Sequence, residues 1–204
     1  MRFSILKTAT AALAFIGGAQ AVIKHDELVD RIKSLADKTE ALAKPAEAVT
    51  LADLSSFATG KGPSHVAFLK VSSDADISSS KELVGGFIEI VSIAANTIPE
   101  LSGAAKISSD AGIDAVTAAF DGLAKASKTL FNILAEKLKI FGNIPVVGQA
   151  ISAVLGAAQK IINELANGVI SLVDGKAEKL KSVTGGLENA FEGIVGDFAK
   201  LLGA

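Results

Sequence analysis

The chain has no cysteine, so no disulfide bond can stabilise its fold. Small secreted domains often use disulfides to compensate for a limited core. This protein must instead gain its stability from the packing of apolar side chains, which belong to 50% of its residues. Redox conditions are therefore not expected to affect its folding.

Trp and Tyr are also absent, and Phe supplies all of the aromatic side chains. Every aromatic ring therefore lacks a hydrogen-bonding tip. Sugar-binding surfaces commonly use Trp and Tyr, because these residues join a flat apolar face to a polar group. The composition argues against a lectin.

Residues for catalysis are scarce. The only histidines are His25 and His65, and neither has the spacing of a metal ligand or of a base beside a nucleophile. His25, Asp26 and Glu27 are adjacent, so on a helix they point in different directions. The signature motifs of serine hydrolases, zinc proteases, P-loop proteins and dinucleotide-binding proteins are missing. We predict no catalytic residue, no metal site and no cofactor. A deep cleft in which two carboxylates, or His65 and a carboxylate, converge would revive an enzymatic function.

The first 21 residues have the pattern of a secretory signal peptide. Arg2 and Lys7 precede an apolar run over 9–16, and Ala19-Gln20-Ala21 is a typical cleavage sequence. The run is shorter than the roughly 20 residues of a spanning helix, so we expect no stable transmembrane segment here. We predict cleavage after Ala21, a single helical domain over 22–204, and a secreted protein of the extracellular space or cell wall.

The charges are nearly balanced and mixed along the chain. Removal of Arg2 and Lys7 with the signal peptide changes the net charge from −2 to −4. A balanced, slightly acidic surface argues against nucleic acid or an anionic lipid surface as an electrostatic partner.

The N-terminal part predicts short helices and a loop. Asp26 is a candidate N-cap for a helix that ends at Pro45, and Thr50–Phe57 is a candidate second helix. The segment His65–Val71 fits either a helix or a strand. The Ser-rich segment 72–80 predicts a polar loop.

The rest of the chain predicts long amphipathic helices. One ends near Pro99, and another begins at Ser109 or Asp110 and continues to Phe141. A third, Pro145–Val173, has only two charges and is expected at the bundle centre. After a turn at Asp174-Gly175, a last helix runs to the C-terminus. We predict an all-α antiparallel bundle with three long C-terminal helices and shorter N-terminal ones.

Four glycines, Gly185, Gly186, Gly193 and Gly196, lie in this last helix. Each weakens an exposed helix interior by about 1 kcal/mol relative to Ala, which would favour a mobile helix. Small residues also allow close packing of two helices, and we prefer that interpretation.

Apolar residues of the second and third long helices are candidates for a ligand cavity. Pockets are mostly apolar and can lie between the helices of a bundle, so an acyl chain or a sterol would suit them. The same residues would equally fill an ordinary close-packed core. The candidate ligand-binding residues are Phe120, Phe131, Leu134, Val147, Ile151 and Leu155.

The segment Phe120–Gly175 resembles a group of small secreted fungal proteins described as UV-inducible. The most specific elements are L-x-N-I-L at 130–134, I-P-V-V-G-Q-A at 144–150 and I-S-L-V at 170–173. The resemblance covers about a quarter to a third of the chain. It implies fungal secretion, stress induction and an α-helical fold, and it carries no site residues.

In composition the chain is similar to fungal cell-wall mannoproteins and hydrophobic-surface-binding proteins. These are secreted, cysteine-poor helical bundles, and some hold fatty acids in a central tunnel. This chain differs from them in its many glycines, in its turn at Gly142-Asn143-Ile144-Pro145 and in the segment before Lys81. The likeness implies binding of apolar ligands.

A membrane-active protein is the alternative. The apolar hairpin over 140–173 resembles those that pore-forming helical proteins hide, and Gly148, Ser152 and Gly156 would suit close helix contact in lipid. Lys160 and Glu164 make it a poor insertion segment. We therefore expect a non-catalytic protein of the fungal exterior that binds a fatty acid, a sterol or a hydrophobic surface. A purely structural or stress-induced wall protein, and weak self-association, remain open.

Overall fold

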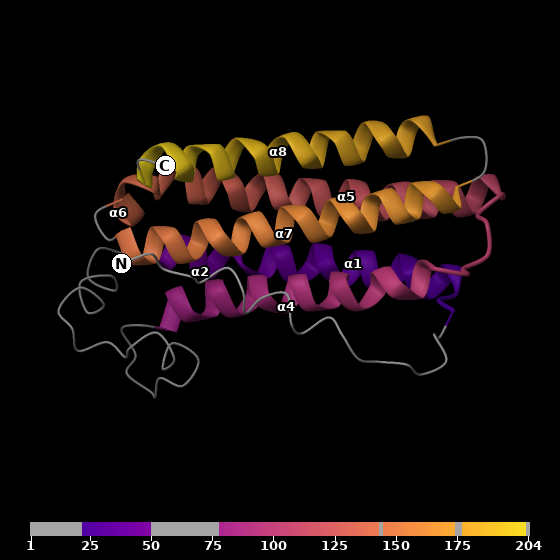
Figure 1. Ribbon diagram of the computed structural model, residues 1–204, viewed down its shortest axis with the longest axis horizontal. Coiled ribbons are helices and arrows are strands. Elements are labelled where there is room, and N and C mark those ends of the chain that lie inside the picture. The colour runs from indigo at the N-terminus through magenta and orange to yellow at the C-terminus, as the bar shows by residue number, and fades with distance from the viewer. Residues whose placement is uncertain (1–21, 50–77, 143–144, 174–176, 203–204) are drawn as a thin grey trace, which may run out of the picture.

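In the computed structural model, the described residues are 22–49, 78–142, 145–173 and 177–202. They fold into an all-α bundle without strands, as the sequence predicts. Five long helices form the bundle: α1 (His25–Ala41), α4 (Ser78–Leu101), α5 (Asp110–Glu136), α7 (Pro145–Leu172) and α8 (Glu178–Leu202). Two short helices, α2 (Ala43–Ala48) and α6 (Leu138–Gly142), lie toward the same end of the bundle (Figure 1).

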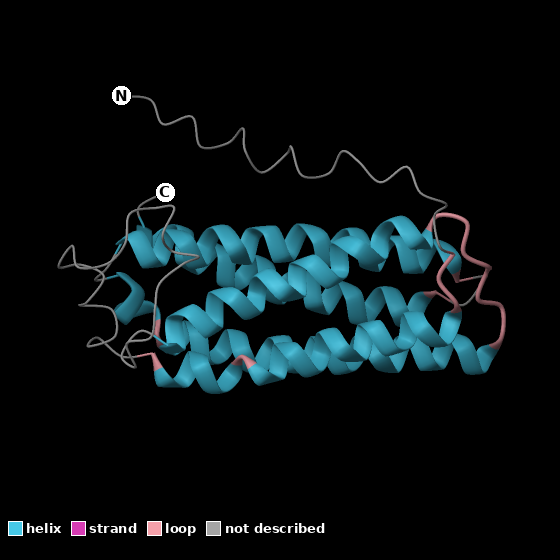
Figure 2. Cartoon of the chain, turned by 90° about the horizontal axis from the view of Figure 1, so that it is seen from below, coloured by secondary structure: helices cyan, strands magenta, loops and turns pink. Residues whose placement is uncertain are grey.

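The long helices form a closed ring. Around it, α1 packs against α5, α5 against α8, α8 against α7, α7 against α4, and α4 against α1. In Figure 1, α8 runs along one side of the molecule, α1 and α4 run along the other, and α5 and α7 lie between them. The side view in Figure 2 shows the same long, narrow bundle. Each helix therefore turns one apolar stripe toward a shared interior.

Helix directions confirm the alternation expected for the C-terminal half. α5, α7 and α8 run along the bundle in alternating directions (Figure 1). Neighbours in the ring are nevertheless often parallel, because α1 runs beside α5 in the same direction and α4 runs beside α7 in the same direction. The order of the helices around the ring could not be predicted from the short turns between consecutive helices.

Several boundaries differ from the sequence-based predictions. α1 begins at His25, with Lys24 at its N-cap, and Asp26 lies in the first turn, where a carboxylate favours the helix dipole. Pro45 does not end a helix; it lies in the first turn of α2, where its missing N–H costs little. The prediction for the start of α5 is confirmed, because the Ser109 hydroxyl accepts a hydrogen bond from the Gly112 N–H at 3.2 Å.

The helix α4 begins earlier than expected and ends near Pro99, as predicted. It begins at Ser78, so Ser78–Ser80 are helical rather than part of the predicted polar loop. It continues past Pro99 to Leu101, and Gly103 then takes a positive φ of 93° that ends the helix.

The long helix expected from Ser109 to Phe141 is interrupted. α5 ends at Glu136, and α6 begins two residues later. Lys137 lies at the break and extends its ammonium to the carbonyl oxygens of Glu47 and Val49, at 2.8 and 3.2 Å. The break thereby joins the end of α2 to the end of α5.

α7 is a member of the ring and does not lie at a bundle centre. Exposed residues recur along one side of it. They are Ala153 and Ala157 and, further toward the C-terminus, the charged Lys160 and Glu164. The prediction failed because small residues such as Ala tolerate solvent well, so a low charge count alone does not show that a helix is enclosed.

One polar network joins α1 to α4. The Arg31 guanidinium donates to Glu27 at 2.7 Å and to Glu100 at 3.0 Å. Burial alone lowers the pKa of Arg31, but the hydrogen bonds and charges of Glu100 and Glu27 outweigh it and raise the pKa above its usual value. Lys38 forms a second bridge to Glu89 at 2.6 Å.

Four sequence-based predictions lie outside the described residues. These are the signal peptide over 1–21, the helix at Thr50–Phe57, the undecided segment His65–Val71, and the turn at Asp174-Gly175. The first six residues of the polar loop over 72–80 lie outside them as well.

Candidate ligand-binding interior and surface hollows

The interior of the ring is one continuous apolar cluster to which all five long helices contribute. A regular ring of five helices spaced 8–10 Å apart places each axis roughly 7 to 8.5 Å from the centre, against about 6 to 7 Å for four helices. The wider interior must be filled by large side chains or by a ligand. The largest side chains that are fully buried include Phe120, Phe198, Leu28, Ile32, Leu83 and Ile151.

Five of the six predicted ligand-binding residues lie in this cluster. Phe120, Leu134 and Leu155 are completely buried, and Phe131 and Ile151 are nearly so. The side chain of Val147 is outside the described part of the structure. Burial is thus confirmed for these five residues, while their contact with a ligand stays a prediction.

These residues are concentrated toward one end of the bundle. Phe131 and Leu134 lie in the last two turns of α5, and Ile151 and Leu155 lie in the first three turns of α7. Because α5 and α7 run in opposite directions, both segments reach the end occupied by α6 (Figure 1). Phe120 lies nearer the middle of α5.

Sequence reasoning missed the contribution of the other three helices. The Phe131 ring packs edge-on against Phe191 of α8, with ring centroids 4.7 Å apart and an interplanar angle of 65°. Phe198 of α8, Phe87 of α4 and Ile32 of α1 are buried in the same cluster. Their three-four spacing marked them as apolar stripes, but nothing in the sequence showed which helix each stripe would face.

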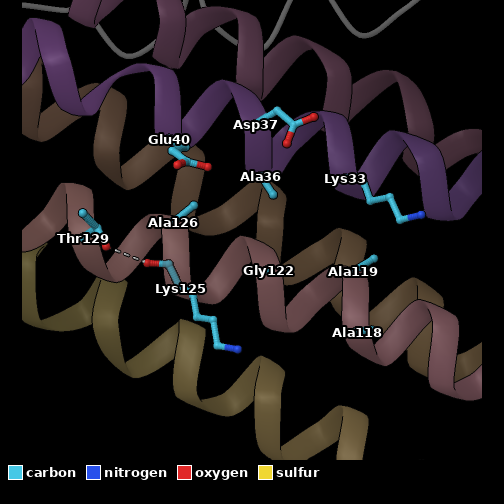
Figure 3. Close-up of a pocket in the computed structure, with 10 residues that line it drawn as sticks. All are labelled: Lys33, Ala36, Asp37, Glu40, Ala118, Ala119, Gly122, Lys125, Ala126 and Thr129. Atoms are coloured by element: carbon cyan, nitrogen blue, oxygen red, sulfur yellow. Dashed lines mark hydrogen bonds between the residues drawn. The ribbon is translucent and has the colours of Figure 1, made fainter.

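A shallow groove runs between α1 and α5 (Figure 3). Its floor consists of small residues, among them Ala36, Ala119 and Gly122. Charged side chains stand along its edges, including Lys33, Asp37 and Lys125 (Figure 3). Lys125 pairs with Asp121 of its own helix at 2.6 Å, outside this lining. The side chains that line this groove do not form a reactive centre.

Two further hollows meet at the opposite end of the bundle, and His25 lines both. The first, about 460 Å³, is lined by Lys24, Leu28, Lys106, Ile107 and Leu172 among others. The second, about 440 Å³, lies between α1 and the start of α5 and includes Asp26, Asp30 and Lys33. His25 Nε2 is buried and has no hydrogen-bond partner among the described residues.

The structure contradicts the preferred explanation of the α8 glycines. A Cβ atom added to Gly185, Gly186, Gly193 or Gly196 would meet nothing within 4 Å. These glycines therefore do not serve close helix contact. The close approaches occur elsewhere: a Cβ on Gly86 would meet the Leu42 side chain, and one on Gly168 would lie 2.6 Å from Leu101 Cδ1.

The described residues contain one helix that is long and apolar enough to cross a membrane, over Glu82–Leu101 of α4. This segment differs from the predicted hairpin over 140–173. About 33% of the 18 most apolar consecutive residues of this segment are buried in the bundle, and Ile88 is 45% exposed. Within the same described ranges, no group of three His, Asp or Glu side chains could hold a metal ion.

No family model matches this chain, and no curated protein matches it. The resemblance to UV-inducible fungal proteins therefore stays a prediction from the sequence.

Two solved structures have the same fold. One is AfMp4p in complex with palmitic acid, with a TM-score of 0.61, 15% sequence identity, and an alignment covering 86% of this chain and 99% of that one. The other is ligand-binding domain 1 of the MP1 protein of Penicillium marneffei, complexed with arachidonic acids, with a TM-score of 0.58, 14% identity, and coverage of 84% and 98%. At these identities the likeness establishes the fold.

Proposed function

We propose that this protein binds a long-chain fatty acid, or another apolar ligand with an acyl chain, inside its ring of five helices. The observation that carries the proposal is the closed ring around one apolar cluster, in the same fold as two domains solved with fatty acids bound. The protein would be a non-catalytic carrier or scavenger that acts outside the cell or at the fungal wall. Its regulation by stress remains a separate prediction.

The shape of the interior supports an elongated ligand. The cluster runs along the helices rather than forming a sphere, since buried residues extend from Leu28 at one end to Leu134 at the other. An acyl chain is long, thin and apolar, so it matches such an interior better than a compact polar metabolite would. The predicted residues Phe131, Ile151 and Leu155, together with Val147, would line the end near α6.

The chemistry of the interior also supports a carrier. Among the described residues, the buried polar side chains are Thr39, Thr97, Thr117, Ser127 and Thr184. The hydroxyls of Thr39 and Thr117 donate to backbone carbonyls one turn earlier in their own helices, at 2.7 Å in each case. Hydroxyls occupied in this way do not form a nucleophile and base pair, and they leave the interior apolar.

Entry of a ligand requires that some helix move or that core side chains rotate. α8 is a candidate for this movement, because its four glycines lower its helical stability without contributing contacts. We therefore infer that these glycines make α8 mobile, which is the alternative that the sequence offered.

The first test is native mass spectrometry of the purified protein, followed by organic extraction and identification of whatever is released. We expect one fatty acid per protein, either retained through purification or acquired after incubation with palmitic acid. A protein that stays empty in both cases, and whose melting temperature does not change with acyl ligands, would contradict the proposal.

A second test places a reporter in the interior. The chain has no Trp, so Phe131→Trp would provide a single fluorophore at the predicted binding end. We expect its emission to change on addition of palmitic acid. The matched control is Ile88→Trp, on the exposed side of α4, which should not respond. An equal response of both would indicate detergent-like adsorption instead of binding inside the ring.

A further inference from the structure

The hollow of about 460 Å³ at the α1 N-terminal end combines an apolar floor with basic groups. Leu28, Ile107 and Leu172 line it and belong to the buried core cluster, so this floor is continuous with the interior of the ring. Val22, at its edge, is 55% exposed. The hollow is thus a place where the core reaches the surface.

Its charged lining has one sign. Lys24 and Lys106 line it, and no Asp or Glu is among its lining residues. Lys24 has no ion-pair partner in the described part of the chain. The Lys106 ammonium donates to the carbonyl oxygen of Ser171 at 2.6 Å, which leaves further N–H groups available, since an ammonium has three.

The adjacent hollow has a different electrostatic character. Asp26 and Asp30 line it together with Lys33, and the carboxylates would oppose an anion there. His25 lies on the border of the two hollows, where its ring contacts the backbone of Gly112 closely. Its buried Nε2 atom has no hydrogen-bond partner in the part of the chain that the structure describes, and a buried polar atom normally has one.

Three separate elements bring these groups together. Lys24 and His25 come from the start of α1, Lys106 from the segment between α4 and α5, and Leu172 from the last turn of α7. The Ile107 N–H donates to the Leu172 carbonyl at 2.8 Å, which fixes the segment bearing Lys106 against α7. The arrangement depends on the folded ring and does not exist in any one helix.

We propose that this hollow receives the carboxylate of the acyl ligand, with Lys24, Lys106 and His25 Nε2 as its polar partners and Leu28, Ile107 and Leu172 against the first methylenes. The inference depends on the proposed fatty-acid binding and adds a direction to it. The acid group lies at the α1 N-terminal end and the hydrocarbon extends toward the end near α6. Cleavage after Ala21, itself a prediction, would add the α-amino group of Val22 to the same site.

The test compares an acid with an uncharged ligand of equal length. Dodecanoic acid and dodecan-1-ol are titrated by calorimetry into the delipidated protein and into Lys24→Gln/Lys106→Gln. We expect the double variant to bind the acid roughly five- to tenfold more weakly, because two charges at exposed positions are lost, and to bind the alcohol within about twofold of the unaltered protein.

The matched control is Lys128→Gln/Lys160→Gln. It removes the same net charge from exposed positions on α5 and α7 that line none of the three hollows described. Binding of both ligands should be unchanged. If this control weakens acid binding as much as the hollow variant does, the effect is one of net charge and the proposed site is wrong.

The outcomes separate the two proposals. Unchanged acid binding in Lys24→Gln/Lys106→Gln would overturn the carboxylate site and leave the fatty-acid carrier standing. Failure of the unaltered protein to bind either ligand would overturn both. His25→Phe keeps a ring over Gly112 and removes Nε2, so we expect roughly threefold weaker acid binding and unchanged alcohol binding; the lysine variants decide the question if this one does not fold.

Discussion

The glycines of α8 differ from those at the helix contacts of α4, α5 and α7. In α8, four glycines face open space, whereas Gly86, Gly112 and Gly168 have a side chain from another element directly above the Cα atom. The residue type and the helical setting are the same, but the reason for glycine is different. At the contacts, glycine makes room for a neighbour; in α8, it only lowers the stability of the helix.

This contrast predicts that one substitution, Gly to Ala, has opposite effects in the two regions. Alanine stabilises a helix wherever its methyl group fits, and destabilises the fold wherever the methyl group meets a fixed neighbour. Chemical denaturation of the ligand-free protein measures the change in the free energy of unfolding, unless another measurement is named. The largest expected change comes first.

The largest effect is expected for Gly112→Ala. The added methyl group would meet His25 Cε1, the Ser109 hydroxyl at 2.8 Å and Ile107 Cγ2 at 3.1 Å. It would also disturb the N-cap of α5, because Ser109 accepts from the Gly112 N–H. We expect a loss of about 2 to 3 kcal/mol in the free energy of unfolding. A variant as stable as the unaltered protein would show that this end of the bundle adjusts freely.

Gly86→Ala and Gly168→Ala should be destabilising by a smaller amount. Their neighbours are the ends of the Leu42 and Leu101 side chains, which can rotate in part. We expect losses of about 1 to 2 kcal/mol after the gain in helix propensity is included. Truncating the neighbour provides the control: Leu101→Ala combined with Gly168→Ala should cost less than the sum of the two single changes.

In α8, each of the changes Gly185→Ala, Gly186→Ala, Gly193→Ala and Gly196→Ala should stabilise the protein by about 0.5 to 1 kcal/mol. The quadruple variant should also release a bound fatty acid several-fold more slowly, if α8 is the helix that opens. Stopped-flow transfer of ligand to lipid vesicles measures the release rate. Greater stability with an unchanged release rate would mean that another element opens.

The most discriminating comparison concerns Gly122 in α5 and Gly156 in α7, where a gain in stability is expected without any effect on ligand release. A Cβ atom at either position would also meet nothing within 4 Å. Gly122→Ala and Gly156→Ala should each stabilise the fold by about 0.5 to 1 kcal/mol and leave ligand release unchanged. Slower release in these variants too would show that overall helix stability, and not opening of α8, limits exchange.

The position of the helices was predictable because the signals are local. Ser109 was identified as a helix start, and the hydroxyl forms the expected cap. Pro145 was identified as the start of the following helix, and α7 begins there. A prediction failed where a breaker residue was tolerated by its position, as at Pro45 in the first turn of α2.

The candidate site was predictable only in part. The apolar spacing correctly marked Phe120, Leu134 and Leu155 as buried. It did not reveal that Phe191 of α8 packs on Phe131, or that Lys106 and Lys24 share one hollow. These pairings join residues far apart in the chain, and a repeating pattern within one helix contains no information about its partner.

The sequence by itself determined that this protein is helical, that its helices are amphipathic and that packing without disulfides stabilises it, because backbone propensity, capping and apolar periodicity act over a few residues. Only the tertiary structure decided the closed order of the five helices, the continuity of the core with the basic hollow at the α1 end, and the division of the glycines into crowded and open positions. Each of these depends on distances between separate segments, which are set when the apolar stripes find each other and exclude water.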